Sequence, residues 1–428
     1  MIEKNDYLVM LIGSSPMPNL ISACTRIKEN GKIFMIYTSE TERIAKQLEE
    51  LIEKKSNDSF FNISVNLEYG KICEEYNLQK VSNDMENILK KIKREYDNES
   101  LENKTIELNF TGGTKIMSST AYRLFKEKFK KENAYLTYLD SEECEFIIYD
   151  IKKNKSEKME YSKKNETLDL NIDDIIDMHF DINENNFECE RIKNSEISKV
   201  NEYIYNSLIE NYDRKDEFID LMEIIFAYNY KKNKNKIKDS IFEINNKIEN
   251  HSFKLNNINN YSEIISCYES EFENLTENKL YEKIMEDTSG KWLEKIILKK
   301  LNNFKDEGYI DDVVISQKRE NKKRKKDKEE FEVDIIILKN ENLYCISVTT
   351  SNIYSEVNMK LHEIWYRGKS LGGDGVRLGI ISFYDNKKAL LEKIKNVWDE
   401  EKDIENKNLI ITLENFIEMD ELLRNWLK

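Results

Sequence analysis

Proline and glycine are scarce in this sequence of 428 residues. It contains 2 prolines and 12 glycines, and neither residue occurs between positions 114 and 289. Both are common in disordered linkers, so their scarcity argues against long unstructured segments. Hydrophobic residues make up 39% of the chain and charged residues 35%, which is typical of a globular protein with a solvated exterior. A chain of this length is long enough to form two or three domains.

Histidine is rare, and closely spaced pairs of cysteines are absent. There are three histidines, and none of the six cysteines belongs to a Cys-x-x-Cys pair, so we do not expect a zinc site. Scattered cysteines fit a reducing compartment. Long apolar runs are also lacking, because the stretch Tyr7–Gly13 is too short to span a bilayer. We therefore expect a cytoplasmic protein without a membrane segment.

The sequence has no excess of positive charge. It carries 67 basic and 82 acidic residues, a net charge of −15, so nucleic acid would be repelled except at a local basic patch. Residues 318–328 form such a patch, with eight basic side chains in eleven positions. We predict that this run lies at a hairpin tip and grips a phosphate backbone; a flexible solvated loop is the alternative.

Three regions differ in their hydrophobic pattern. Residues 1–150 alternate apolar runs with amphipathic stretches, which predicts βαβ units and a mainly parallel sheet, a Rossmann-like α/β domain. Residues 151–288 show helical periodicity and predict a helical connector, or an extension of the neighbouring domains. Residues 289–428 predict helix, three strands, helix and strand, which is an α/β/α arrangement.

Two polar turns of the first region follow apolar runs that we predict to be strands. The run Tyr7–Gly13 ends in Ser-Ser-Pro-Met-Pro-Asn, and residues 106–110 end in Thr-Gly-Gly-Thr-Lys. Hydroxyl groups and the amides of a helix N-terminus donate hydrogen bonds to an anion, glycines allow close approach, and a lysine adds charge. An ordinary capped strand–helix turn is the alternative. The candidate ligand-binding residues are Ser14, Ser15, Asn19, Thr111, Gly112, Gly113, Thr114 and Lys115.

These two turns together resemble the CARF domain, the ligand-sensing module of type III CRISPR ancillary effectors. The resemblance covers residues 1 to about 150. It implies a homodimer that binds one cyclic oligoadenylate, in particular cyclic tetra-adenylate, across its two-fold axis. An isologous dimer fits a two-fold symmetric ligand.

The third region carries carboxylates in an order that suits metal-dependent cleavage of phosphodiesters. Such chemistry needs clustered carboxylates for a hard cation and a lysine for charge. Glu294 falls in the first turns of the predicted helix, and Asp334 directly precedes the apolar run 335–338. Both are candidate catalytic residues and ligands of Mg²⁺ or Mn²⁺.

The segments Gly-Lys-Trp-Leu-Glu, Glu-Val-Asp and Leu-Gly-Gly in this region resemble the PD-(D/E)XK nuclease domain fused to CARF domains, a restriction-endonuclease-like fold. The resemblance implies a second acidic residue and a lysine on the next strand. This sequence has Ser347 and Thr349 in their places, and neither replaces its counterpart fully. Lys360, or Glu363 on the same helix face, is a candidate for a migrated group; a solvated charged face is the alternative.

The predicted function is therefore an antiviral endonuclease of type III CRISPR defence that is allosterically activated by cyclic oligoadenylate. The alternative is a catalytically degenerate sensor that binds nucleic acid or a protein partner without cleaving it. Degradation of the cyclic ligand by the CARF domain itself is a third hypothesis.

Overall fold

Two separate β-sheets organise the computed structural model. It describes residues 4–59, 62–68, 70–100, 102–141, 143–161, 169–179, 188–230, 241–317, 332–397 and 407–428. The basic run at 318–328 lies outside the described residues, so its predicted hairpin tip stays a prediction.

The first sheet has the strand order β3-β2-β1-β5-β6-β7-β8, and β4 pairs with β2. Its five strands from β3 to β6 are parallel, which confirms the predicted parallel sheet, and β7 and β8 add an antiparallel edge. The strands are β1 (Asn5–Leu11), β2 (Ile27–Thr38), β3 (Ser64–Asn66), β4 (Lys71–Ile72), β5 (Thr105–Asn109), β6 (Asn133–Asp140), β7 (Glu145–Asp150) and β8 (Lys155–Glu160). Because β8 belongs to this sheet, the first domain extends beyond the predicted boundary at residue 150.

Helices cover both faces of this sheet. Leu8 and Met10 of β1 share a hydrophobic cluster with α1 (Met17–Arg26) and α2 (Glu42–Ser59). The alternate residues Tyr7 and Val9 share a cluster with α3 (Leu78–Asn98) and α4 (Lys115–Lys128). A strand that is buried on both faces has to be apolar throughout, which explains the unbroken apolar run in the sequence.

The second sheet has the order β14-β13-β12-β11-β10-β9. Helices α12 (Tyr354–Gly372) and α13 (Lys387–Val397) pack on one face, and α11 (Trp292–Asp306) and α15 (Met419–Trp426) on the other. The strands are β9 (Glu188–Glu190), β10 (Asp312–Gln317), β11 (Ile335–Lys339), β12 (Asn342–Thr349), β13 (Arg377–Ser382) and β14 (Leu409–Ile411). The predicted α/β/α arrangement of the C-terminal domain is confirmed. Its first strand, however, comes from the middle region.

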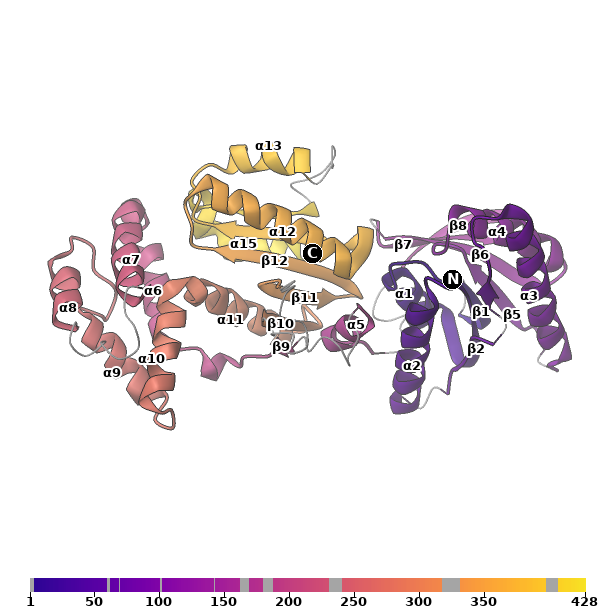
Figure 1. The fold of residues 1–428 in the computed structure, drawn as a ribbon, viewed down its shortest axis with the longest axis horizontal. Coiled ribbons are helices and arrows are strands. Elements are labelled where there is room, and N and C mark those ends of the chain that lie inside the picture. Colours follow the sequence, from indigo (N-terminus) through magenta and orange to yellow (C-terminus); the bar gives the residue numbers. More distant parts are fainter. Residues whose placement is uncertain are drawn as a thin grey trace.

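The middle helices do not connect the two sheets. They share one hydrophobic cluster with α11 and the second sheet, and Figure 1 shows them at the end of the second domain that is remote from the first. They are α6 (Lys199–Glu210), α7 (Lys215–Tyr230), α8 (Ile241–Asn250), α9 (Tyr261–Glu271) and α10 (Glu277–Glu286). The structure thus favours an extension of the second domain over a connector. Helix α5 (Ile172–His179) lies between the domains instead, where it contacts α2 and α12.

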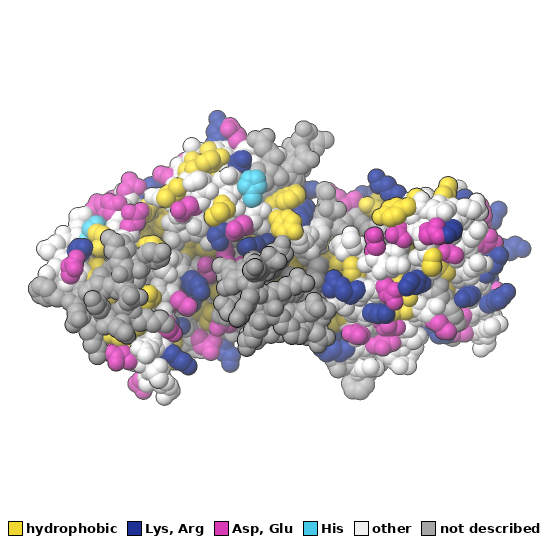
Figure 2. Space-filling view, in the orientation of Figure 1, with side chains coloured by type: hydrophobic (Ala, Val, Ile, Leu, Met, Phe, Trp, Pro, Cys, Tyr) yellow, Lys and Arg dark blue, Asp and Glu magenta, His cyan; other side chains and the backbone are white. Residues whose placement is uncertain are grey.

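The surface carries charges of both signs. Figure 2 shows Lys and Arg side chains interspersed with Asp and Glu over the visible face of both domains. No helix among the described residues is long and apolar enough to cross a membrane.

Candidate functional site

The two polar turns follow neighbouring parallel strands. Tyr7 of β1 is in register with Ile106 of β5, and Met10 with Asn109. After β1 the chain continues to β2 on one side of this pair, and after β5 it continues to β6 on the other side. The strand order therefore reverses between β1 and β5. Ligands of open α/β sheets bind at such a switch point, beyond the carboxyl ends of the strands.

The turns pack directly against each other, and glycine is required where they touch. A methyl group on Gly112 would lie 2.1 Å from the carbonyl oxygen of Leu11, and one on Gly13 would lie 3.2 Å from the amide nitrogen of Gly113. Gly113 also has a φ of 77°, a conformation that favours glycine. The two turns therefore meet at one edge of the sheet.

Several backbone amides at this edge have no acceptor among the described residues. Within the described chain, the amides of Ser14, Ser15, Gly112 and Gly113 donate no hydrogen bond to another residue, and all four residues are at least partly exposed. Thr114 accepts a bond from the amide of Met117, which caps α4, and Thr111 accepts one from the amide of Leu139. Each hydroxyl keeps its hydrogen for a further acceptor. The edge therefore offers donors without an acceptor of its own.

Asn19 and Ser15 lie differently from the other predicted ligand-binding residues. Asn19 is fully buried and donates to the carbonyl of Leu11 at 2.9 Å, so in this structure it supports the turn and does not face solvent. The hydroxyl oxygen of Ser15 is buried and without a hydrogen-bond partner among the described residues. Ser14 and Lys115 are exposed.

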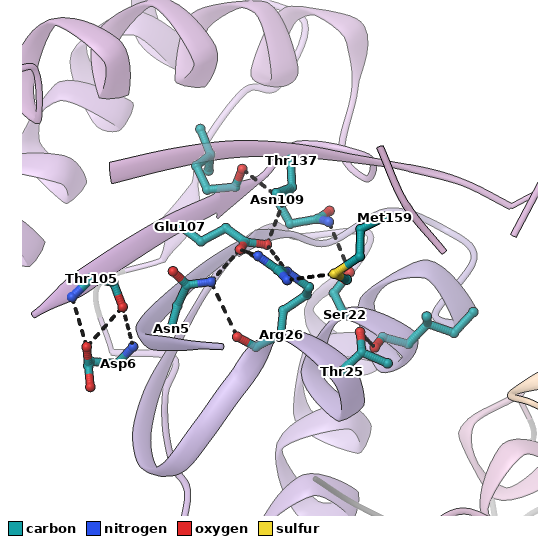
Figure 3. Close-up of polar contacts among 12 residues, drawn as sticks. Asn5, Asp6, Ser22, Thr25, Arg26, Thr105, Glu107, Asn109, Thr137 and Met159 are labelled. Atoms are coloured by element: carbon teal, nitrogen blue, oxygen red, sulfur yellow. Dashed lines mark hydrogen bonds and ion pairs between the residues drawn. The ribbon is translucent and has the colours of Figure 1, made fainter. Parts of the chain in front are cut away.

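A buried polar network supports the turns from below (Figure 3). The Arg26 guanidinium pairs with Glu107 at 2.6 Å, and the two side chains are 1% and 0% exposed. Above this pair, Asn109 donates to Ser22 at 3.0 Å and accepts from the amide of Thr111 at 3.1 Å. Asn109 therefore joins α1 to the start of the second turn, two residues beyond the ion pair on β5. The signal of this network in the sequence was a lone glutamate within an apolar strand.

A cluster of three aromatic residues lies beside the second turn. The ring of Phe110 is 5.9 Å from the ring of Tyr138 and 5.4 Å from that of Tyr122. Tyr138 is 42% exposed. Sequence reasoning missed this cluster, although Phe110 directly precedes Thr111 in the chain.

The second domain brings Glu294, Asp334 and Lys360 together. Burial, followed by the charge of Asp334, raises the pKa of Glu294 to about 8. Burial also raises the pKa of Asp334, although Lys360 opposes this effect. The ammonium nitrogen of Lys360 lies 3.8 Å from Oδ1 of Asp334 and 3.9 Å from a carboxylate oxygen of Glu363. These four residues come from α11, the approach to β11, and α12.

Ser347 and Thr349 have different positions at this centre. Ser347 donates to Oδ2 of Asp334 at 2.9 Å, and the amide of Val348 donates to the same atom at 2.7 Å. Thr349 accepts a bond from the amide of Ser351, so it shapes the turn after β12. A glycine with φ of 122°, Gly290, begins the approach to α11, and a methyl group there would lie 3.0 Å from Oγ1 of Thr350. The chain just before α11 therefore passes close to the end of β12.

Residues 7–174 match the family model of the Card1 CARF domain. The N-terminal domain is a CARF domain. The match includes both turns, the supporting network and the first residues of α5.

Two solved structures share the architecture of the CARF domain and of the domain that follows it. Protein VC1899 from Vibrio cholerae superposes with a TM-score of 0.64 and 13% identity, over 98% of this chain and 97% of that one. Can2 from Sulfobacillus thermosulfidooxidans, solved in complex with cyclic tetra-adenylate, superposes with a TM-score of 0.58 and 14% identity, over 98% of this chain and 99% of that one. At such identities the likeness establishes the fold. No curated protein matches the sequence.

The carboxylates Glu294 and Asp334 of the second domain fit a hard divalent cation in part. Glu294 and Asp334 offer carboxylate oxygens, which Mg²⁺ and Mn²⁺ prefer. Among the described residues, however, no three His, Cys, Asp or Glu side chains gather as a metal-binding group. Mg²⁺ is commonly held by one or two carboxylates, with water and substrate phosphates completing its shell. Glu294 and Asp334 are the residues that would hold it, and the metal would neutralise charge on the cleaved phosphate.

Proposed function

We propose that this protein senses a cyclic oligoadenylate with its CARF domain and cleaves nucleic acid with its second domain, in type III CRISPR antiviral defence. The observation that carries the first half is the pair of abutting turns at the switch point, where the backbone amides of Ser14, Ser15, Gly112 and Gly113 have no acceptor among the described residues. The fold shared with Can2, whose structure contains cyclic tetra-adenylate, supports this ligand class.

A ring of nucleotides matches what the edge offers. Its phosphates would accept hydrogen bonds from the turn amides and from Thr111 and Thr114, and Lys115 would add a positive charge. Its adenine bases would stack on aromatic rings such as Tyr138, which is 42% exposed. A two-fold symmetric ring would engage the same turns of two chains, which predicts a homodimer.

The nuclease half of the proposal depends on the cluster around Asp334. Glu294 and Asp334 would hold Mg²⁺ or Mn²⁺, and Lys360 would replace the lysine that is absent at position 349. Lys360 lies within 3.8 Å of Asp334, so it can stabilise the negative charge of the cleaved phosphate. Ser347 would orient Asp334 through its hydrogen bond instead of binding the metal itself.

A non-catalytic sensor is the second candidate function. The observation that favours it is the occupation of Oδ2 of Asp334 by Ser347 and the amide of Val348. A carboxylate already engaged by two donors is a weaker metal ligand. In this case, ligand binding would control the retention of nucleic acid or of a protein partner, with no chemical step.

Cleavage assays separate the two functions. The full chain is incubated with plasmid DNA, single-stranded DNA and single-stranded RNA in Mg²⁺ or Mn²⁺, with and without cyclic tetra-adenylate. We expect ligand-dependent cleavage, and its loss in Asp334→Asn but not in the exposed control Asp385→Asn. Ligand-dependent gel retardation without any product would support the non-catalytic sensor. Analysis of the ligand after prolonged incubation tests whether the CARF domain degrades it.

A further inference from the structure

A turn of the second domain covers part of the ligand edge of the CARF domain. We call residues 372–375, Gly-Gly-Asp-Gly, the glycine turn; it ends α12 and begins a short 3-10 helix. A methyl group on Gly373 would lie 2.9 Å from Oγ of Ser15. One on Gly375 would lie 2.9 Å from both Cβ and the carbonyl oxygen of Ser141. Ser15 follows β1 and Ser141 follows β6, so the glycine turn contacts loops on both sides of β5.

The contact leaves Ser15 unsatisfied. Its hydroxyl oxygen is buried but has no hydrogen-bond partner within the described chain. A buried hydroxyl without a partner destabilises the arrangement that buries it. A phosphate oxygen would supply the missing acceptor, but only if the glycine turn moves away from Ser15. The ligand-free contact is therefore one that an anionic ligand would tend to break.

The same helix reaches the centre around Asp334. Helix α12 runs from Tyr354 to Gly372, and Lys360 on it lies 3.8 Å from Asp334. Arg367 on this helix donates to the carbonyl of Glu332 at 2.6 Å, two residues before Asp334. A helix is a rigid element, so displacement of its last turn also moves the groups on its earlier turns.

We propose that the glycine turn is an autoinhibitory contact: it occupies the Ser15 side of the ligand site, and cyclic oligoadenylate displaces it and shifts α12 together with Lys360. This inference rests on the proposed function and names its regulation. By linkage, anything that holds the turn in place weakens ligand binding, and anything that loosens it strengthens binding.

A reversible cross-link tests the contact in the full chain. Ser141→Cys and Gly375→Cys are combined in a Cys144→Ser background, because the native Cys144 thiol lies 3.9 Å from the Ser141 carbonyl. The 2.9 Å between the two Cβ positions is close to the roughly 3.5–4.5 Å of a disulfide, so a small outward shift allows the bond. The two single cysteine variants in the same background are the matched controls.

Affinity for cyclic tetra-adenylate is then measured before and after reduction. We expect the oxidised protein to bind at least tenfold more weakly than the reduced protein, with full recovery on reduction. In the single-cysteine controls, reduction should leave the affinity unchanged. Gly375→Ala tests the opposite direction, since its methyl group pushes against Ser141; we expect tighter binding. A gain in affinity cannot arise from misfolding.

Equal affinity of the oxidised and reduced forms, with the disulfide verified by mass spectrometry, would overturn the proposal. Failure of the disulfide to form without ligand would do the same. If the unmodified protein does not bind cyclic tetra-adenylate, the proposed function itself is wrong, and the autoinhibitory contact falls with it.

Discussion

The ammonium nitrogen of Lys360 lies 3.8 Å from Oδ1 of Asp334. Lys360 belongs to helix α12, whereas Asp334 directly precedes strand β11. Position 349, where the PD-(D/E)XK pattern that this region resembles has a lysine, holds a threonine that accepts a hydrogen bond from the amide of Ser351. The positive charge beside Asp334 therefore comes from α12.

Replacement of Lys360 tests whether its charge is used in cleavage. We expect Lys360→Met to reduce ligand-activated cleavage about 100-fold, because a positioned charge at the reacting phosphate is lost. Lys360→Arg keeps the charge and should retain much of the activity. Lys388→Met, at an exposed position of α13, is the matched control. Unchanged cleavage in Lys360→Met would show that the charge of Lys360 is not used.

The raised pKa of Glu294 predicts how cleavage depends on pH. With a pKa of about 8, this carboxyl group is largely protonated at pH 7 unless a cation binds there. Protons and metal then compete, so metal binding releases protons. We expect the Mg²⁺ concentration for half-maximal cleavage to fall as the pH rises from 6 to 8. Glu294→Gln should abolish cleavage at every pH, and a half-maximal Mg²⁺ concentration of the parent that does not change with pH would contradict this account.

The same group predicts a stability difference. The folded state raises the pKa of Glu294 from 4.5 to about 8, so the folded protein binds this proton more tightly than the unfolded chain does. Stability is therefore lost as the pH rises from about 4.5 through about 8. Without metal, Glu294→Gln should be more stable than the parent at pH 8, by about 1 kcal/mol or more, and nearly equal at pH 4.5. Thermal unfolding at both pH values measures this; a parent that is more stable at pH 8 would contradict it.

A methyl group on Gly112 should block the ligand edge. It would meet the Leu11 carbonyl oxygen at 2.1 Å, so the two turns must separate. We expect Gly112→Ala to weaken binding of cyclic tetra-adenylate at least tenfold in calorimetric titration. Gly308→Ala is the control for backbone strain: Gly308 lies in the second domain with a φ of 71°, and no atom lies within 4 Å of the added methyl group. Equal loss in both variants would mean that glycine replacement acts through general destabilisation.

The buried pair of Arg26 and Glu107 should stabilise the CARF domain only as a pair. Arg26→Met leaves an uncompensated buried carboxylate, which costs about 3–5 kcal/mol. Adding Glu107→Leu removes that charge, and we expect the double variant to recover part of the loss. Hydrogen exchange of β5 amides in the full chain reports the effect. A double variant less stable than the sum of the single changes would contradict this account.

The sequence was most informative where local rules decide the structure. The apolar run of β1 and its Ser-Ser-Pro turn, and β5 with its Thr-Gly-Gly-Thr-Lys turn, follow from burial on both faces and from glycine at close contacts. Their mutual approach then follows from parallel pairing. Asn19 was different: its residue type suits both a ligand contact and a support of the turn, and only its burial distinguishes the two.

Long-range pairing was the main feature that local patterns did not predict. Residues 188–190 form β9 in the second sheet, far in sequence from their partner β10. The helices of the middle region look like a connector by composition, yet they share a hydrophobic cluster with α11. Nothing in their periodicity says which surface they cover. The contact of the glycine turn with Ser15 likewise depends on how the two domains pack.

Calorimetric titration of the full chain with cyclic tetra-adenylate tests the central claim most directly. The account predicts saturable binding of one ring per two chains, which Gly112→Ala weakens and Gly308→Ala leaves unchanged. Absence of binding, or binding that Gly112→Ala does not alter, would contradict a ligand site at the turns that follow β1 and β5.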